Sequence, residues 1–161
     1  MANHSDKQAL FDSVIAQLAS DIQIVEQAVE VAIDTATHKD CLGSSKYETM
    51  GTEASYLAKG QGERLLELQR ALAYFKQLKP ESSKSIQLTS WVVLEDENGK
   101  SQSLLMAADA GGLKVSYDKQ IVTVITPQAP LGKSLMGKTV GDTIELKFTG
   151  KTRCLEVIDV T

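Results

Sequence analysis

This chain has few aromatic residues, few cysteines and no long apolar run, and each shortage excludes a class of protein. Aromatic side chains make up 5% of the 161 residues, which argues against a platform that stacks nucleic-acid bases. The two cysteines lie far apart and form no CxxC pair, so nothing indicates a disulfide framework. No apolar run approaches the roughly 18 residues that span a bilayer, and the start, MANHSDKQALFD, does not resemble a secretory signal. We therefore expect a soluble, cytoplasmic protein without a membrane partner.

The chain also lacks an excess of positive charge. Its formal net charge of −4 argues against binding nucleic acid through bulk electrostatic attraction, which requires a basic face. Charge is nevertheless unevenly distributed, because residues 6–34 contain six acids and one base whereas residues 59–79 contain five bases and two acids. We interpret these segments as two solvated faces that attract each other. The alternative is a basic stripe that attracts phosphates, although the two faces partly cancel each other's field.

The first half of the chain has the apolar periodicity of two helices. Apolar residues recur at alternating steps of three and four, which is the pattern of a coiled-coil seam. The polar segment 37–45 separates the two rows, so residues 1–80 are predicted to form a long antiparallel coiled-coil hairpin with arms of roughly 45 Å. The expected seam residues are Phe11, Ile15, Leu18, Ile22, Val25, Val29, Ala32 and Ala36 in the first helix and Met50, Ala54, Leu57, Gln61, Leu65, Leu68, Leu72 and Phe75 in the second.

Beyond residue 80 the apolar spacing changes to that of strands. Thr143–Phe148 alternates apolar and polar residues, and Ile121–Thr126 is rich in β-branched residues. A short helical turn is expected between Pro130, whose fixed φ suits a first helical position, and Gly137, which tolerates the left-handed cap conformation. The sequence therefore predicts an α+β protein in which residues 81–161 form a small antiparallel β domain.

The segment Ile121–Leu146, IVTVITPQAPLGKSLMGKTVGDTIEL, resembles the C-terminal domain of the Gre-type bacterial transcript cleavage factors. Glu53–Lys59, EASYLAK, is similar to the start of that family's second coiled-coil helix. The resemblance implies a coiled-coil hairpin followed by an FKBP-like β domain that binds RNA polymerase at the rim of its secondary channel. It also implies that the hairpin brings its tip to the active centre, close to the nascent RNA 3′ end. The expected polymerase-binding residues are Pro130, Leu131, Gly132, Lys133 and Lys138.

In the Gre family, two acids spaced three apart at the hairpin tip are thought to help hold a second Mg²⁺ at the polymerase active site. The resemblance therefore implies an accessory factor rather than an enzyme, with no metal of its own and a Mg²⁺ shared with the polymerase. With Tyr56 aligned to the family's tyrosine, Thr49 and Thr52 occupy the positions of the two acids. The candidate catalytic carboxylates that remain near the tip are Asp40, Glu48 and Glu53.

The spacing of Glu48 and Glu53 does not favour a shared metal. Residues five apart on a helix are separated by about 140° of rotation at 3.6 residues per turn, so the two acids converge only if Gly51 breaks the helix. Each acid also has a structural interpretation. Ser45 and Glu48 fit a capping box, and Glu53 suits a first-turn or solvated position.

We interpret the chain as a transcription elongation factor that binds RNA polymerase through its secondary channel and stimulates cleavage of backtracked RNA. The alternative is a non-cleaving homologue that modulates the polymerase by occupying the channel. A peptidyl-prolyl isomerase of the FKBP type is a third hypothesis, but residues 81–161 offer only Trp91, Tyr117 and Phe148 for the aromatic pocket of such an enzyme. A structural adaptor that oligomerises through the hairpin is a fourth.

Overall fold

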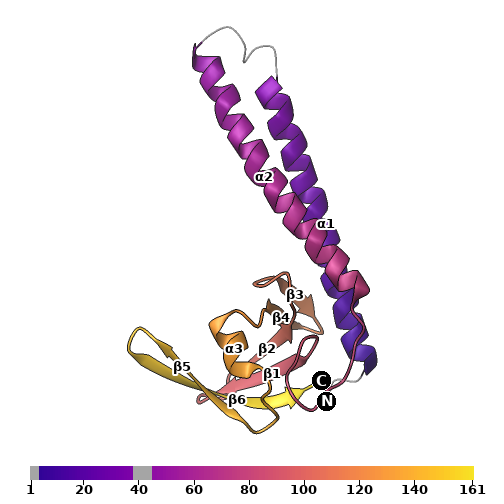
Figure 1. The fold of residues 1–161 in the computed structure, drawn as a ribbon, viewed down its shortest axis with the longest axis vertical. Coiled ribbons are helices and arrows are strands. Elements are labelled where there is room, and N and C mark those ends of the chain that lie inside the picture. Colours follow the sequence, from indigo (N-terminus) through magenta and orange to yellow (C-terminus); the bar gives the residue numbers. More distant parts are fainter. Residues whose placement is uncertain (1–3, 38–44) are drawn as a thin grey trace. The chain divides into compact units, whose positions relative to one another are not determined.

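The computed structural model of the chain describes residues 4–37 and 45–161. Two long helices, α1 (His4–Thr37) and α2 (Ser45–Gln77), precede a six-stranded sheet and confirm the predicted α+β class (Figure 1). None of the helices in the described ranges combines the length and apolarity needed to cross a bilayer. The other elements are β1 (Trp91–Asp96), β2 (Ser101–Met106), β3 (Lys114–Tyr117), β4 (Gln120–Ile125), α3 (Pro130–Leu135), β5 (Thr143–Phe148) and β6 (Lys151–Val160).

The chain divides into two compact units. One unit is Ile15–Ala73, and the other combines Met1–Val14 with Tyr74–Thr161. The N-terminal part of α1 and the C-terminal end of α2 therefore belong to the unit that contains the sheet. The domain boundary predicted between residues 80 and 81 falls inside that unit and stays a prediction.

The seam of α1 lies where the sequence spacing places it. Every predicted seam position from Phe11 to Ala36 is buried or half-buried, and Phe11, Leu18 and Ile22 are among the most buried. Phe11 also packs edge-to-face on Phe75 of α2, with 6.3 Å between the ring centroids. The apolar period of α1 was therefore sufficient to identify its buried face.

The seam of α2 differs from the prediction in its N-terminal half. Met50 and Leu57 are 45% and 55% exposed, so their assignment to the seam was wrong. Ala54 is buried as predicted, and Ala58 and Gly51, which were not assigned to the seam, are half-buried. When steps of three and four residues alternate without interruption, counted back from Phe75 at the C-terminal end of α2, they reach these small residues and not their larger neighbours.

The sheet has the strand order β3-β4-β2-β1-β6-β5, and its neighbouring strands are antiparallel except for the parallel pair β2–β4. This pair differs from the expected all-antiparallel sheet. After β2 the chain first forms the edge strand β3, and β4 then pairs antiparallel with β3 and parallel with β2. Period-two alternation marks a strand without showing the direction of its partner. One buried cluster unites the sheet with α3 and contains Ile86, Val92, Leu94, Leu104, Met106, Ile125, Leu135, Ile144, Leu146, Leu155 and Val157.

Lys7 joins the start of α1 to the unit that contains the sheet. Its side chain is fully buried, and Nζ donates hydrogen bonds to the backbone carbonyls of Glu81 and Thr161, the latter at 2.8 Å. Burial lowers the pKa of the Lys7 amine to about 8, against the opposing attraction of the nearby Glu81 carboxylate. In the same unit, the backbone N–H of Ala108 donates to the hydroxyl oxygen of Tyr74 at 2.9 Å. Sequence patterning did not indicate either contact.

Candidate functional site

The segment that contains the expected polymerase-binding residues is built around α3. Pro130 occupies the first turn of α3, and Ala129 before it is extended, with φ −64° and ψ 147°. The backbone N–H of Met136 donates to the carbonyl of Gly132 at 3.1 Å, and Gly137 follows with a φ of 79°. The predicted start and end of this helical turn are therefore confirmed.

Gly132 is buried because α3 lies directly against the end of β4. A Cβ atom at Gly132 would lie 1.9 Å from the backbone oxygen of Thr126, so no larger residue fits without movement of the backbone. Leu131 is partly buried and packs against the core cluster. Pro130 and Lys133 are exposed, so these are the two predicted contact residues that the fold presents most openly.

The loop after α3 is held by backbone and side-chain hydrogen bonds. Gly137 N–H donates to the Ile86 carbonyl at 2.8 Å, and Ile86 N–H donates to the carbonyl of the half-buried Lys138 at 2.8 Å. The Asp142 carboxylate accepts from the backbone N–H of Thr139 at 2.8 Å and from its hydroxyl at 3.2 Å. The backbone hydrogen bond is the main reason that the pKa of Asp142 lies below its ordinary value. Lys138 is therefore attached to a well-anchored loop.

The three candidate tip carboxylates are only partly described. Asp40 lies outside the described residues, and Glu48 belongs to α2, where nothing is described of its side chain. Glu53 is exposed on α2. Helix α2 runs unbroken from Ser45 to Gln77, so Gly51 does not break it and positions 48 and 53 remain about 140° apart around the axis. The geometry therefore does not provide the helix break on which a shared metal between these two acids depends.

The two threonines that the resemblance aligns with the family's acids are part of this continuous helix. Thr49 and Thr52 are both exposed on α2, and Ser55 Oγ donates to the Gly51 carbonyl at 2.9 Å, as expected inside a helix. Threonine hydroxyls are neutral, whereas Mg²⁺ is usually held by at least one carboxylate. Within the described parts of the chain, no group of three or more His, Cys, Asp or Glu side chains could hold a metal ion.

The aromatic residues of the sheet unit do not form an apolar pocket of the isomerase type. Trp91 and Tyr117 pack edge-to-face at 5.6 Å and border a cavity of about 290 Å³ that is also lined by Asp6 and Asp118. Phe148 is 52% exposed on β5 and does not line this cavity. The cavity has a carboxylate-rich wall, so the geometry does not favour binding of an apolar proline ring.

Residues 81–161 match the family model described as "Transcription elongation factor, GreA/GreB, C-term". The match covers half of the chain and includes the whole of the sheet and α3. The chain therefore belongs to the GreA/GreB family of transcription elongation factors, which act as accessory factors on RNA polymerase.

The chain is also similar to individual proteins and solved structures. The transcription elongation factor GreA of Thermotoga neapolitana is 27% identical over 128 residues, which cover 76% of this chain and 73% of that protein. The crystal structure of GreA factor homolog 1 (Gfh1) of Thermus thermophilus is 20% identical, covers 91% of this chain and 94% of its own, and superimposes with a TM-score of 0.39. A GreA/GreB factor from Nitrosomonas europaea is 22% identical, covers 58% of this chain and 78% of its own, and has a TM-score of 0.39.

Proposed function

We propose that this factor binds RNA polymerase at the rim of its secondary channel through the surface around α3 and occupies the channel with its helical hairpin. Pro130 and Lys133 are exposed on α3, which is fixed to the core by Leu135 and to the end of β4 by Gly132. The helices α1 and α2 contain 34 and 33 residues, which corresponds to arms of about 50 Å. Helices of this length suit a function that requires reach into a deep channel.

Modulation of the polymerase by occupancy, without stimulated cleavage, is the version that the geometry supports best. The observation that carries it is the unbroken helix α2, which keeps positions 48 and 53 on different sides of the helix axis. Positions 49 and 52 of the same helix are occupied by threonines, which carry no charge. A pair of acids that cannot converge provides at most one carboxylate ligand at a time from this helix.

Stimulated cleavage of backtracked RNA is the second candidate. The exposed carboxylate of Glu53 favours it, because one carboxylate from an accessory factor, alone or with Asp40 or Glu48, suffices to contribute to a Mg²⁺ shared with the polymerase. In that case the polymerase active site performs the hydrolysis of the RNA 3′ segment, and this chain supplies a ligand and no independent catalysis.

An assay on arrested elongation complexes separates the two candidates. Purified complexes with labelled RNA are incubated with Mg²⁺ and the factor, and both RNA length and factor co-sedimentation are measured. We expect the factor to bind while the RNA keeps its length. Shortened RNA that depends on Glu53, tested with Glu53→Gln, supports the second candidate. Absence of binding contradicts both.

A further inference from the structure

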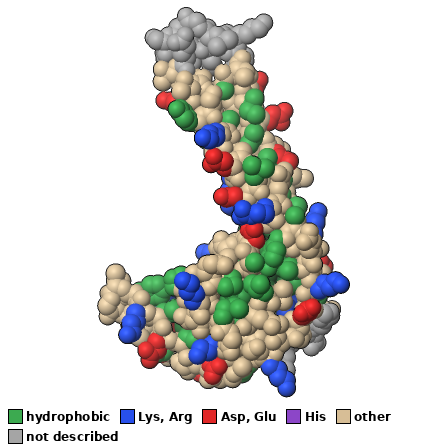
Figure 2. All heavy atoms as spheres, in the orientation of Figure 1, with side chains coloured by type: hydrophobic (Ala, Val, Ile, Leu, Met, Phe, Trp, Pro, Cys, Tyr) green, Lys and Arg blue, Asp and Glu red, His purple; other side chains and the backbone are tan. Residues whose placement is uncertain are grey.

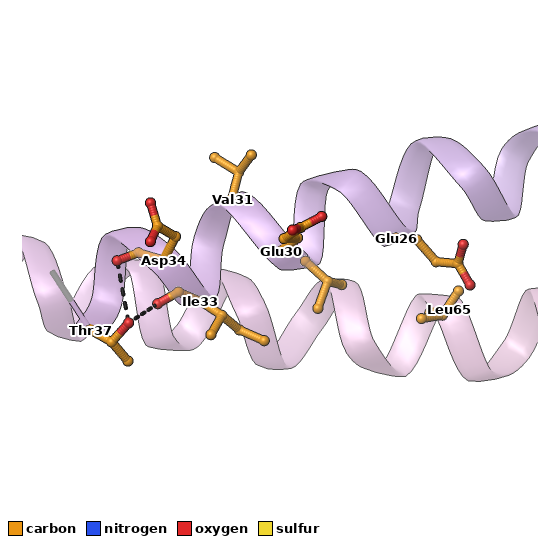
Figure 3. A pocket seen from close by; sticks show the side chains of 8 residues that line it. Glu26, Glu30, Val31, Ile33, Asp34, Thr37 and Leu65 are labelled. Atoms are coloured by element: carbon orange, nitrogen blue, oxygen red, sulfur yellow. Dashed lines mark hydrogen bonds between the residues drawn. The ribbon is translucent and has the colours of Figure 1, made fainter.

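The helical unit Ile15–Ala73 contains a groove that the sequence analysis did not identify. The groove has a volume of about 700 Å³, and Figure 3 shows its wall on α1 with Leu65 contributed by α2. Its apolar part includes the half-buried Val29 and Leu65 and the more open Ile33 and Val31, which are 50% and 66% exposed. We call it the acidic groove, and it is lined by Glu26, Val29, Glu30, Val31, Ile33, Asp34, Thr37 and Leu65.

Three carboxylates give the acidic groove its charge. Glu26, Glu30 and Asp34 follow one another at steps of four, so they form a single stripe along α1. Within residues 4–37 and 45–161, no Lys or Arg forms an ion pair with any of the three. Acidic and apolar side chains are exposed next to each other on the helical pair (Figure 2). The surface therefore combines exposed apolar side chains with three carboxylates that form no ion pair within the described residues.

We propose that the acidic groove binds a basic, amphipathic helix of RNA polymerase, an inference that rests on the function proposed above. From Glu26 to Thr37 the groove extends about 16 Å along α1, enough for roughly three turns of a docked helix. Leucine-like side chains at helical spacing on the partner would contact Val31 and Ile33, and its Lys or Arg side chains would face the carboxylate stripe. Nucleic acid is disfavoured as the occupant because the stripe repels phosphates.

A second copy of this chain matches the acidic groove less well. The bases of α2 are interspersed with acids, and Arg64 already pairs with Glu67 at 3.3 Å. The basic surface that another copy offers is therefore partly neutralised before it meets the carboxylate stripe. Self-association through the acidic groove would therefore contradict the proposal.

Charge reversal tests the electrostatic half of the proposal. We expect Glu30→Lys/Asp34→Lys to weaken binding to core RNA polymerase about tenfold or more and to reduce its salt dependence. The matched control is Glu63→Lys, an exposed acid of α2 that does not line the groove, which should leave the dissociation constant nearly unchanged. Far-UV circular dichroism checks that helix content is retained in each variant.

Truncation of one exposed side chain tests the apolar half. Val31→Ser should weaken polymerase binding several-fold, whereas Leu66→Ser on α2, which is 67% exposed against 66% for Val31 and lies outside the groove, should not. Wild-type affinity in both groove variants overturns this proposal and leaves the proposed function intact. Failure of the wild-type factor to bind polymerase overturns both proposals. A dimer in sedimentation that the charge reversal dissociates shows that a second copy occupies the groove.

Discussion

Gly132 shows how strictly one residue can be determined by its surroundings. The position falls within a helical turn, where glycine is ordinarily unfavourable, yet the backbone oxygen of Thr126 occupies the space of a Cβ atom. A sequence analysis can identify the motif that contains such a glycine, but it cannot separate a glycine required for close packing from one that contacts a partner. The burial of Gly132 favours the packing role.

Substitution of Gly132 should therefore affect stability directly. We expect Gly132→Ala to lower the free energy of unfolding by about 1–3 kcal/mol or more, because the new methyl group forces α3 away from the end of β4. Urea unfolding followed by the fluorescence of Trp91, the single tryptophan, reports on the same unit. Ser134→Ala, also on α3, is the control. Equal midpoints for both variants would contradict the close approach seen here.

Lys7 predicts an unusual dependence of stability on pH. Its pKa is about 8 in the folded chain against an ordinary value of 10.5, so between these values the unfolded chain binds more protons. The free energy of unfolding should therefore rise with pH across this window, because the unfavourable burial of the charged amine is present below pH 8 and is progressively relieved above it. The neutral amine keeps two N–H groups for the carbonyls of Glu81 and Thr161.

The measurement for Lys7 is a comparison with Lys7→Met at several pH values. Methionine removes the titrating amine, so the stability difference between the wild-type chain and the variant should grow in favour of the wild type between about pH 8 and 10. The variant should also be less stable throughout, because the carbonyls of Glu81 and Thr161 each lose the hydrogen bond from Lys7, although that of Thr161 keeps the backbone N–H of Trp91. A difference that stays constant with pH would show that the amine is not perturbed.

At the scale of elements, the helices show both the strength and the limit of periodicity. The seam of α1 follows from the positions of its large apolar residues, and the structure confirms it. In α2 the prediction was right for Ala54, but it also chose Met50 and Leu57 because they are large, whereas the buried row continues through the half-buried Gly51 and Ala58. Residue size is thus a weaker guide than an uninterrupted heptad when small residues form the interface.

The glycines of α2 offer a prediction about this element. A Cβ atom at Gly62 would meet no atom within 4 Å, so Gly62→Ala gains helix propensity without a clash. We expect the variant to be more stable by up to about 1 kcal/mol, measured as a higher midpoint of thermal unfolding in circular dichroism at 222 nm. Gly60→Ala, which is equally unobstructed, should behave alike, and a lower midpoint in both would indicate that the helix requires flexibility there.

At the scale of the whole molecule, the candidate site was predictable only as far as the family resemblance extends. The PLGKSLMGK motif located α3 and its exposed Pro130 and Lys133, because proline and glycine determine the local backbone. The acidic groove has no such motif. It depends on which side chains two helices leave uncovered when they pack, and that arrangement is not apparent in either helix alone.

The surface around α3 leads to a prediction about the complete factor. Lys133→Glu should weaken binding to RNA polymerase by roughly two- to tenfold, since Lys133 is exposed on an element anchored by the core. Lys151→Glu, an exposed base on β6, provides a matched charge change. Both affinities can be measured by titration of labelled factor with core polymerase, and equal losses would indicate a general electrostatic effect instead of a contact.

The hydrogen bonds of Lys7 have a practical consequence for chimeras between relatives. The family domain begins at residue 81, but the amine that binds the carbonyls of Glu81 and Thr161 comes from the first turns of α1. A hybrid spliced at residue 81 would combine two parents within one folding unit, and an excised fragment 81–161 would lose the Lys7 donor at both carbonyls, although the Thr161 carbonyl keeps the backbone N–H of Trp91 at 2.9 Å. Grafts that carry residues 1–14 along with the sheet should retain the native environment of this lysine.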